Sequence, residues 1–276
     1  MPKYSFITCV SRPDVYDRCT LSSIKNIRKN HEIEVIPIIN NDNRYTASIA
    51  LNIGIDVSRS EYLIIAHQDI DFIGDDWLIK LDNIIAALDD DWAIIGSAGI
   101  ALQYGEDDIG KWGGALNTDT VAVGSVYDGI GSDPYWNGLK PTQLVHCIDE
   151  CVFVLKKSTY LRFDTMLNGF HFYGVDICLQ ARAAGYGVYG ADLPITHFGK
   201  YSASFSTDTN YWKFFRFVHE KWHRRFPVLY GTHMHWNSDG LVSYIPVAME
   251  DDFGHRIDLK SVGISKLKIK RGDRDA

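Results

Sequence analysis

Apolar runs of strand length alternate with segments of helical spacing in the first third of the chain. Residues 16–29, 46–54 and 77–88 carry apolar positions at the intervals of an amphipathic helix. The intervening runs have the length of buried strands: Tyr4–Val10, Glu34–Ile39, Tyr62–Ala66 and Trp92–Gly96. This alternation predicts an α/β fold with a mostly parallel sheet flanked by helices. Pro37 cannot donate a backbone hydrogen bond, so its strand is expected to be irregular or to lie at an edge of the sheet.

Polar residues and one glycine mark the expected ends of these helices. Thr46 or Ser48 is placed to cap the second helix through its hydroxyl group. Gly54 is placed to end that helix, because glycine adopts the left-handed conformation of a helix terminus. Asp75 or Asp76 is placed to cap the third helix.

The pattern changes after residue 96. Residues 97–144 are rich in Gly, Asp, Tyr and Trp and contain only brief apolar runs. Irregular segments of this length usually form binding loops or lids, although their aromatic side chains could instead cover the core. Strand character returns over residues 144–148 and 151–155. Asp176 then opens a helix that ends at Gly185, and a last short strand delivers His197 at its end.

Composition narrows the class of protein. The chain has 276 residues and a net charge of −7, so nothing global favours a nucleic acid partner. No apolar run approaches the roughly 20 residues of a membrane-spanning helix, and Met1–Tyr4 lead directly into a strand without a signal peptide. The five cysteines form no CxxC pair, which favours reduced thiols and a cytoplasmic location. The basic run Lys266–Arg271 could contact anionic lipid at the inner face of the membrane, or could be a solvated terminus.

Polar residues concentrate where the third apolar run ends. The sequence after Tyr62–Ala66 reads His67-Gln68-Asp69-Ile70-Asp71. Open α/β sheets bind ligands at the carboxyl ends of their strands, and two carboxylates there could hold a cation that holds a phosphate. An ordinary acidic turn is the alternative. No G-x-G-x-x-G follows the first strand, which disfavours a dinucleotide-binding domain and weakens a nucleotidyltransferase interpretation.

Three motifs then occur in one order: HQDID at 67–71, GFHFYGVDICLQARAAGYGV at 169–188 and LPITHFGKYS at 193–202. Together they resemble bacterial glycosyltransferases of the GT-A type, close to the inverting family 2 and its capsule and O-antigen relatives. The resemblance covers roughly residues 4–205 and includes ASIALNIGI at 47–55. It implies a Rossmann-like GT-A domain over residues 1–226, with 97–144 as an acceptor-side or lid insertion and 227–276 as a small C-terminal extension.

The resemblance also implies roles for individual residues. In such enzymes the acidic motif binds Mn²⁺ or Mg²⁺, which bridges the diphosphate of the donor. Asp69 matches the last aspartate of the motif, His67 replaces the first, and Asp71 is a second acidic candidate. His197 matches the histidine that completes the metal site, and carboxylate with imidazole suits Mn²⁺. The positions expected around the nucleotide-sugar are Ser11, Arg12, Asn40, Asn41, Asp42, Asn52, His67, Gln68 and Asp69.

One position departs from the pattern of that family. Aligned on Asp176-Ile-Cys-Leu, the place of the usual catalytic base is Gly174. Asp176, two residues further on, is the first candidate for the base, although it could simply place a charge at the start of its helix. Asp149 is the second candidate, and Glu150 and His171 are others. A retaining mechanism or a loss of activity is also consistent with a glycine at this position.

The sequence therefore predicts a metal-dependent glycosyltransferase that moves a sugar from a nucleotide-sugar donor to a glycan or lipid-linked acceptor. The alternative is a catalytically inactive carbohydrate- or nucleotide-binding module that keeps the fold and has lost the base. Neither the donor sugar nor the oligomeric state follows from these motifs.

Overall fold

The structure is a computed structural model that describes residues 1–28, 31–102, 120–129, 134–137, 141–199, 209–226, 229–230, 234–237, 240–243 and 267–269. The chain divides into two compact units. Met1–Ala101 and Thr120–Lys200 form the first unit, and Leu102–Asp119 and Tyr201–Ala276 form the second. The sequence placed the boundary after residue 226, whereas this division groups residues 209–226 with the C-terminal strands.

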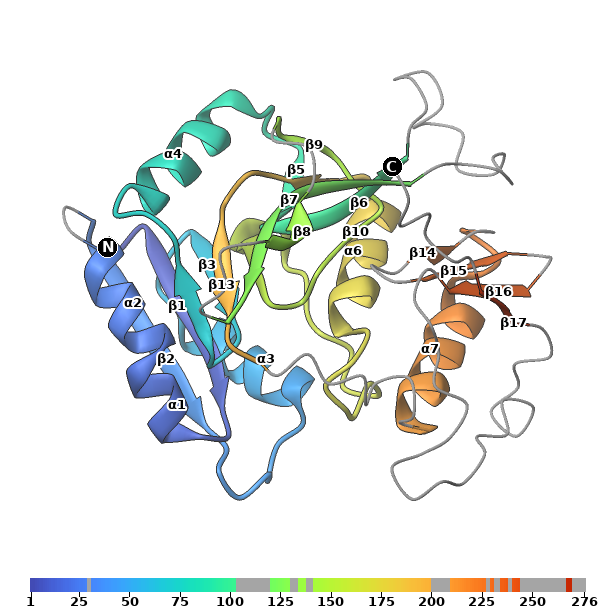
Figure 1. Cartoon of the computed structure of the whole chain (residues 1–276), viewed down its shortest axis with the longest axis horizontal. Coiled ribbons are helices and arrows are strands. Elements are labelled where there is room, and N and C mark those ends of the chain that lie inside the picture. Colours follow the sequence, from blue (N-terminus) through green and yellow to red (C-terminus); the bar gives the residue numbers. More distant parts are fainter. Residues whose placement is uncertain are drawn as a thin grey trace. The chain divides into compact units, whose positions relative to one another are not determined.

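A seven-stranded sheet in the order β2-β1-β3-β11-β5-β12-β9 forms the centre of the first unit (Figure 1). Its strands are β1 (Tyr4–Val10), β2 (Ile33–Ile39), β3 (Tyr62–Ala66), β5 (Trp92–Gly96), β9 (Gln143–Leu144), β11 (Val152–Lys156) and β12 (Gly187–Gly190). β1 is parallel to β2 and β3, and β5 is parallel to β12. β2 with its Pro37 lies at the edge of the sheet, as predicted.

Antiparallel pairing is more frequent than the sequence indicated. β11 runs antiparallel to both β3 and β5, and β9 runs antiparallel to β12. Parallel neighbours need a crossover, which helices supply here for β1, β2 and β3. In the described residues before β11, the chain instead passes through short strands of a second sheet. The α/β architecture holds, and the sheet is mixed.

Helices cover both faces of this sheet. They are α1 (Pro13–Arg18), α2 (Thr20–Ile27), α3 (Ala47–Val57), α4 (Trp77–Ala87), the short 3-10 helix η1 (Lys157–Thr159) and α6 (Tyr173–Ala183). Apolar residues of α2 and α4 share one core cluster with Tyr4 and Phe6 of β1. Since side chains alternate along a strand, the neighbouring Ile7 faces the other side, where α3 packs. The buried strand β3 thus has helices on both sides.

The helix ends follow the predicted signals only in part. Thr46 caps α3, because its hydroxyl accepts a hydrogen bond from the Ile49 amide at 3.3 Å. The predicted end at Gly54 is wrong, since α3 continues to Val57. A Cβ atom at Gly54 would lie 2.3 Å from Cγ2 of Ile7, so this glycine allows α3 to approach β1.

Two further helix predictions need correction. The single helix expected over residues 16–29 is α1 and α2, separated at Cys19, because Pro13 starts a helix earlier than the apolar pattern indicated. Asp76 occupies the position before α4, but its side chain makes no capping hydrogen bond. Its carboxylate instead pairs with Lys80 at 3.2 Å.

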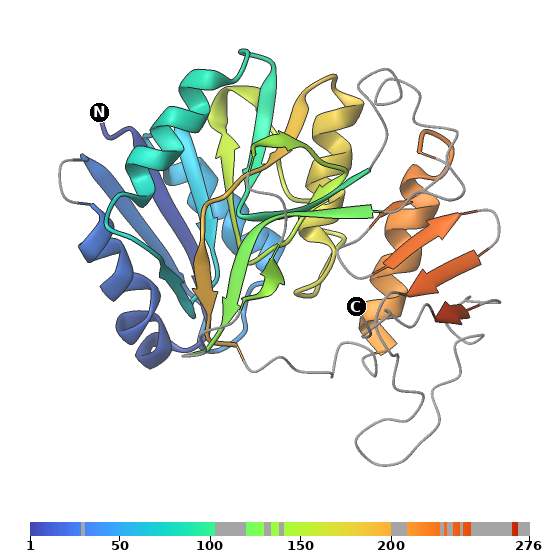
Figure 2. The same cartoon turned by 45° about the horizontal axis from the view of Figure 1, so that its top comes forward.

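A second sheet in the first unit has the order β10-β6-β7-β13-β4, with β8 paired to β7. Its strands are β4 (Ile70–Phe72), β6 (Ala98–Leu102), β7 (Thr120–Asp128), β8 (Pro134–Asn137), β10 (Cys147–Ile148) and β13 (Ile195–His197). β13 pairs antiparallel with β4, which places His197 opposite Ile70. This pairing brings the histidine at the end of β13 to the acidic motif. Figure 2 shows the two strands side by side.

The described parts of residues 97–144 are mostly strands, so the prediction of an irregular segment is wrong there; residues 103–119, 130–133 and 138–140 lie outside the described residues. The strand expected over 144–148 is also wrong. β9 and β10 belong to different sheets, because the buried Val145 and His146 lie where the chain passes from one sheet to the other. The role of this segment as a lid stays a prediction.

The second unit contains α7 (Thr209–Trp222) and a four-stranded sheet in the order β14-β15-β16-β17. Its strands are β14 (Leu229–Tyr230), β15 (Met234–Asn237), β16 (Gly240–Ser243) and β17 (Leu267–Ile269). β17 falls inside the basic run and pairs with β16. Among the described residues, no helix is long and apolar enough to cross a bilayer. All five cysteines are free thiols.

The contact between Gly54 and Ile7 predicts the effect of adding one methyl group. We expect Gly54→Ala to lower the free energy of unfolding by roughly 1–2 kcal/mol, because overpacking outweighs the better helix propensity of alanine. Urea denaturation measures this change. In an Ile7→Ala background the obstructing methyl group is gone, so the same substitution should be neutral or stabilising. An equal loss in both backgrounds would contradict the packing explanation.

Candidate functional site

The turn between β3 and β4 carries the acidic motif and is fixed by its backbone. The hydroxyl of Thr20, at the start of α2, donates to the His67 carbonyl at 2.8 Å and accepts from the Ile70 amide at 3.0 Å. The His67 amide donates to the Cys151 carbonyl at 2.9 Å. Since both ends of the turn are tied to neighbouring elements, its side chains have defined positions. Thr20 had no recognisable sequence signal, because its partner lies 47 residues away.

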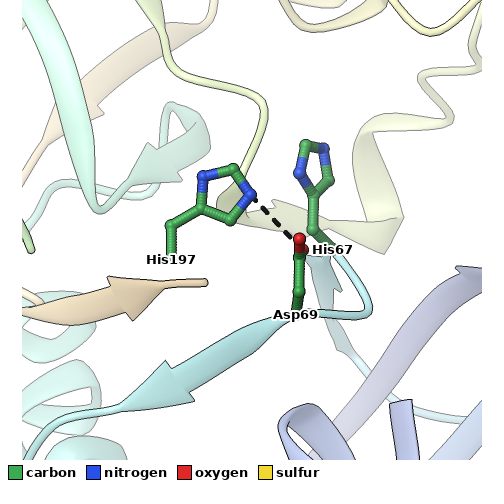
Figure 3. A group of neighbouring side chains, drawn as sticks. All are labelled: His67, Asp69 and His197. Atoms are coloured by element: carbon green, nitrogen blue, oxygen red, sulfur yellow. Dashed lines mark ion pairs between the residues drawn. The ribbon is translucent and has the colours of Figure 1, made fainter. Parts of the chain in front are cut away.

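Three side chains converge at this turn (Figure 3). Asp69 and His197 approach to 3.3 Å between Oδ1 and Nε2, and the Phe198 amide donates to the Asp69 carbonyl at 2.8 Å. His67 completes the group, in which one ligand atom from each residue lies within 4.8 Å of the others. Figure 3 shows both imidazoles above the Asp69 carboxylate. The structure thus brings Asp69 and His197 together as expected for metal ligands, and adds His67.

The protonation states of this group suit a cation. Burial, together with the nearby His197, lowers the pKa of His67 to about 4, so its imidazole is neutral at pH 7. Burial opposes ionisation of Asp69, but the hydrogen bond and charge of His197 outweigh it and lower the pKa of the carboxyl group. The Tyr173 hydroxyl lies 2.9 Å from Nε2 of His67 and orients the ring.

The ligand atoms of His67, Asp69 and His197 suit a first-row divalent cation. One carboxylate and two imidazoles match Mn²⁺ better than Mg²⁺, which prefers oxygen ligands. Three protein ligands would leave positions on such a cation for phosphate oxygens. Asp71 is not in this group of the described residues; it lies in β4 opposite Thr196. Its predicted role as a ligand has no geometric support comparable to that of His67.

Gln68 joins the acidic turn to the end of β1. Its Oε1 accepts hydrogen bonds from the backbone amides of Ser11 at 3.0 Å and Arg12 at 2.8 Å. The Arg12 guanidinium is exposed and lies 3.6 Å from the Asp14 carboxylate, a weak surface pair. Ser11 and Arg12 are therefore adjacent to the turn that carries the metal candidates, and their contact with the nucleotide-sugar stays a prediction.

The other positions expected around the nucleotide-sugar differ in exposure. Asn40 is fully buried, and its amide exchanges two hydrogen bonds with the Tyr45 backbone, each 2.9 Å long. Asn41 and Asp42 are exposed at the end of β2, and Asp42 pairs with Arg44 at 2.6 Å. Asn40 thus shapes the turn that presents its two neighbours.

Asn52 holds α3 against the segment before α6. Its side-chain amide donates to the Phe163 carbonyl at 2.9 Å and accepts from the Phe163 amide at 3.0 Å. Both polar ends of the side chain are therefore used in packing. Its expected contact with the nucleotide-sugar stays a prediction.

The acidic candidates for the base lie in different surroundings. Asp176 is 1% exposed and accepts a hydrogen bond from Gln180 at 2.8 Å. Asp149 accepts one from the Cys151 amide at 3.0 Å, within its own turn. Glu150 accepts one from the Gly174 amide at 2.8 Å, at the start of α6.

The start of α6 is unusual in its backbone. Phe172 precedes the helix with a left-handed φ of +64°, and its side chain makes no capping bond. The carboxylate of Glu150, which lies outside the helix, accepts hydrogen bonds from the backbone amides of Gly174 and Phe172. Burial raises the pKa of Glu150 to about 8. The charge of the neighbouring Asp149 also raises this pKa, whereas the hydrogen bonds from the two amides lower it.

A family model described as a glycosyltransferase-like family matches residues 5–203. The chain belongs to this glycosyltransferase-like family. A curated relative from Fuscovulum blasticum, named "ATP synthase subunits region ORF 6", is 26% identical over 171 residues, which are 61% of this chain and 62% of the relative. The chain therefore spans about three fifths of the length of this relative.

Solved glycosyltransferase structures share the fold of this family member. One is GalNAc-T7 with UDP, GalNAc and Mn²⁺, with a TM-score of 0.52 and 11% identity, covering 82% of this chain and 49% of the other. Another is the mannosyltransferase PcManGT from Pyrobaculum calidifontis with GDP-Man and Mn²⁺, with a TM-score of 0.51 and 11% identity, covering 81% of this chain and 64% of the other. These likenesses show a GT-A fold, as the sequence predicted.

The raised pKa of Glu150 predicts a pH-dependent stability of this glycosyltransferase. Between its ordinary value of 4.5 and about 8, the folded chain retains a proton that the unfolded chain releases. The contribution is therefore complete below about pH 4.5 and is lost as the pH rises through 8. We expect Glu150→Gln, which cannot ionise, to gain about 1–3 kcal/mol relative to the unmodified chain between pH 5 and pH 9.

Urea unfolding of both proteins across this pH range measures the difference. Glu32→Gln is the matched control, because Glu32 is exposed and loses the same charge. If Glu150→Gln and Glu32→Gln follow the same pH dependence, the described environment of Glu150 is wrong.

Proposed function

We propose that this chain transfers a sugar from a nucleotide-sugar donor to a hydroxyl group of a glycan or lipid-linked acceptor, in a metal-dependent reaction. The observation that carries the proposal is the convergence of His67, Asp69 and His197 beside the loop that follows β1. Membership of the glycosyltransferase-like family and the GT-A fold support it. The two solved relatives described above were each determined with a nucleotide or nucleotide-sugar and Mn²⁺.

The metal ligands in this proposal are Asp69, His197 and His67, with Asp71 as a further acidic candidate. A bound Mn²⁺ or Mg²⁺ would offset the negative charge that develops on the leaving diphosphate. At neutral pH Asp69 is ionised and His67 is neutral, so both residues have ligand atoms available for a cation.

The nucleotide part of the donor is assigned to the ends of β1 and β2. Arg12 is exposed, and its pair with Asp14 is weak enough to be exchanged for a phosphate. Asn41 and Asp42 offer exposed polar groups to the nucleoside. Ser11, Gln68, Asn40 and Asn52 contribute mainly by positioning these loops, because their described hydrogen bonds are made to the protein.

Acceptor binding is assigned to residues 97–144, as the composition of that segment indicated. The protein is further proposed to be cytoplasmic, because its sequence has the cysteine pattern of a reduced protein. Its basic run Lys266–Arg271 is proposed to contact anionic lipid at the inner face of the membrane. Asp176 and Asp149 remain the candidates for the base that the sequence favoured.

Turnover with defined donors tests the function. The unmodified chain is incubated with Mn²⁺ and a panel of UDP-, GDP-, dTDP- and CMP-linked sugars, and release of the nucleotide is measured with water or simple glycosides as acceptors. We expect release from one class of donor. Tight Mn²⁺-dependent binding of a nucleoside diphosphate without turnover of any donor would favour the inactive binding module.

Removal of the carboxylate at position 69 tests the metal site. We expect Asp69→Ala to weaken Mn²⁺-dependent binding of UDP or GDP by at least about 100-fold, because a direct ligand matters more than its supporting groups. Isothermal titration with and without Mn²⁺ measures this loss. Asp89→Ala, at an exposed position after α4, is the matched control.

Asp71→Asn distinguishes two ligand sets. If it weakens Mn²⁺-dependent binding while His67→Ala leaves that binding unchanged, Asp71 belongs to the site in place of His67. Unchanged affinity and metal dependence in Asp69→Ala would contradict the metal assignment altogether.

A further inference from the structure

Glu150 is a partly buried carboxylate that accepts a hydrogen bond from Gly174, the neighbour in the chain of Tyr173, and the Tyr173 hydroxyl contacts the proposed metal ligand His67. We propose that Glu150 is the general base of the transfer and takes the proton of the acceptor hydroxyl group. This inference rests on the proposed function and adds the residue that performs the proton transfer.

Two short paths connect Glu150 to the metal group. Its neighbour in the chain, Cys151, accepts a hydrogen bond from the His67 amide at 2.9 Å. The helix residue beside its partner Gly174 is Tyr173, whose hydroxyl lies 2.9 Å from Nε2 of His67. Glu150 is therefore tied from both sides to the residue that lies next to the proposed cation, which places its carboxylate at the same end of β3 as Asp69.

Glu150 and Gly174 fit one another. A Cβ atom at position 174 would lie 2.6 Å from Cγ of Glu150 and 3.4 Å from its Oε1. A side chain there would have to displace the glutamate, because real Cβ atoms do not approach other carbons so closely. The glycine thus leaves the space that Glu150 occupies, and its amide holds the carboxylate at 2.8 Å. The sequence alone showed an acid missing at 174; the structure has an acid there from another element.

The other carboxylates near this helix are less suited to the reaction. Asp176 is 1% exposed and is bonded to Gln180, which also donates to the Arg162 carbonyl at 3.0 Å. This arrangement fixes α6 against the segment before it. Asp149 accepts from the amide of Cys151 and closes its own turn. A base must reach the acceptor. Asp176 is buried, whereas Asp149 and Glu150 are both partly exposed, and of these two Glu150 is the one whose carboxylate contacts Gly174.

In the proposed transfer, Glu150 deprotonates the acceptor. An oxygen of the Glu150 carboxylate takes the hydroxyl proton while the acceptor oxygen forms a bond to the anomeric carbon of the donor. The bond from that carbon to the diphosphate oxygen breaks, and its electron pair leaves with the nucleoside diphosphate. The products are the glycoside, the nucleoside diphosphate and protonated Glu150, which returns its proton to solvent. A direct displacement of this kind inverts the configuration at the anomeric carbon.

A capping role is the structural alternative, since Glu150 accepts hydrogen bonds from amides at the start of α6. Glu150→Gln separates the two roles, because glutamine keeps an oxygen acceptor for the Gly174 amide and loses the basicity. We expect nucleotide release from the active donor of the panel to fall by about 100-fold or more. Mn²⁺-dependent affinity for UDP or GDP should change little, and the melting temperature near pH 7 should not fall, because the variant is spared the cost of ionising a buried acid. Glu32→Gln is the control.

A second pair of variants moves the acid. In Glu150→Gly the carboxylate is absent, and we expect the same loss of turnover. Adding Gly174→Asp to that variant places an acid on the helix in the vacated space, where Ile148 Cδ1 would lie 3.3 Å from the new Cβ. We expect the double variant to recover at least about 10-fold over Glu150→Gly, whereas Gly174→Asp alone should be impaired by the clash with Glu150.

The outcomes separate this inference from the proposed function. If the unmodified chain turns over a donor and Glu150→Gln keeps more than half of that rate, Glu150 is not the base and the transferase function stands. Loss of nucleotide binding together with turnover in Glu150→Gln would show a structural role only and also overturns the inference. If the unmodified chain turns over no donor of the panel, the proposed function fails and the inference fails with it.

Discussion

The antiparallel pairing of β13 with β4 is the interaction on which the site depends. In an antiparallel pair the start of one strand lies against the end of the other. The start of β4 carries Asp69, and the end of β13 carries His197, so three residues of pairing are enough to bring the two side chains within 3.3 Å. The hydrogen bond from the Phe198 amide to the Asp69 carbonyl extends the pairing past the strand ends. The group formed by His67, Asp69 and His197 therefore depends on the second sheet, whose strand β4 follows the turn at the end of β3.

The electrostatics of the site follow from its partial burial. Charges are costly to bury, and in this group the pKa shifts leave the Asp69 carboxylate ionised and the His67 imidazole neutral at neutral pH. An ionised acid with neutral imidazole beside it is ready for a cation without release of a proton from His67. At Glu150 burial raises the pKa and so favours the protonated acid. Hydrogen bonds from the amides of Gly174 and Phe172 offset part of this increase. His67 and Asp69 thus have lowered pKa values, whereas Glu150 has a raised one.

The sequence predicted local features well and long-range contacts poorly. The strand Tyr62–Ala66, the polar residues after it and the Thr46 cap depend on neighbours in the chain, so pattern and spacing were sufficient to identify them. His197 was assigned to the site by resemblance to a family, because nothing near it in the chain indicates Asp69 as its partner.

The remaining features depend on residues that are distant in the chain. Gly54 reads as a helix end until the position of Ile7 is known, and Thr20 reads as an ordinary residue of a helix. Likewise the space at Gly174 has meaning only with Glu150 in place. The division of residues 143–148 between two sheets was missed because two-residue strands carry no periodicity.

The hydrogen bonds of Gln68 have a consequence for phosphate recognition. Many nucleotide-binding folds cradle phosphates with unpaired amides in the loop after the first strand. Here the amides of Ser11 and Arg12 already donate to Gln68, so that loop has no amide nest at these two positions to offer an anion. Under the proposed function, recognition of the diphosphate would therefore fall to a bound cation and to exposed cationic side chains such as Arg12. A chain built in this way would gain affinity for its donor only as free divalent cation becomes available, so that the supply of Mn²⁺ in the cell would set its working range.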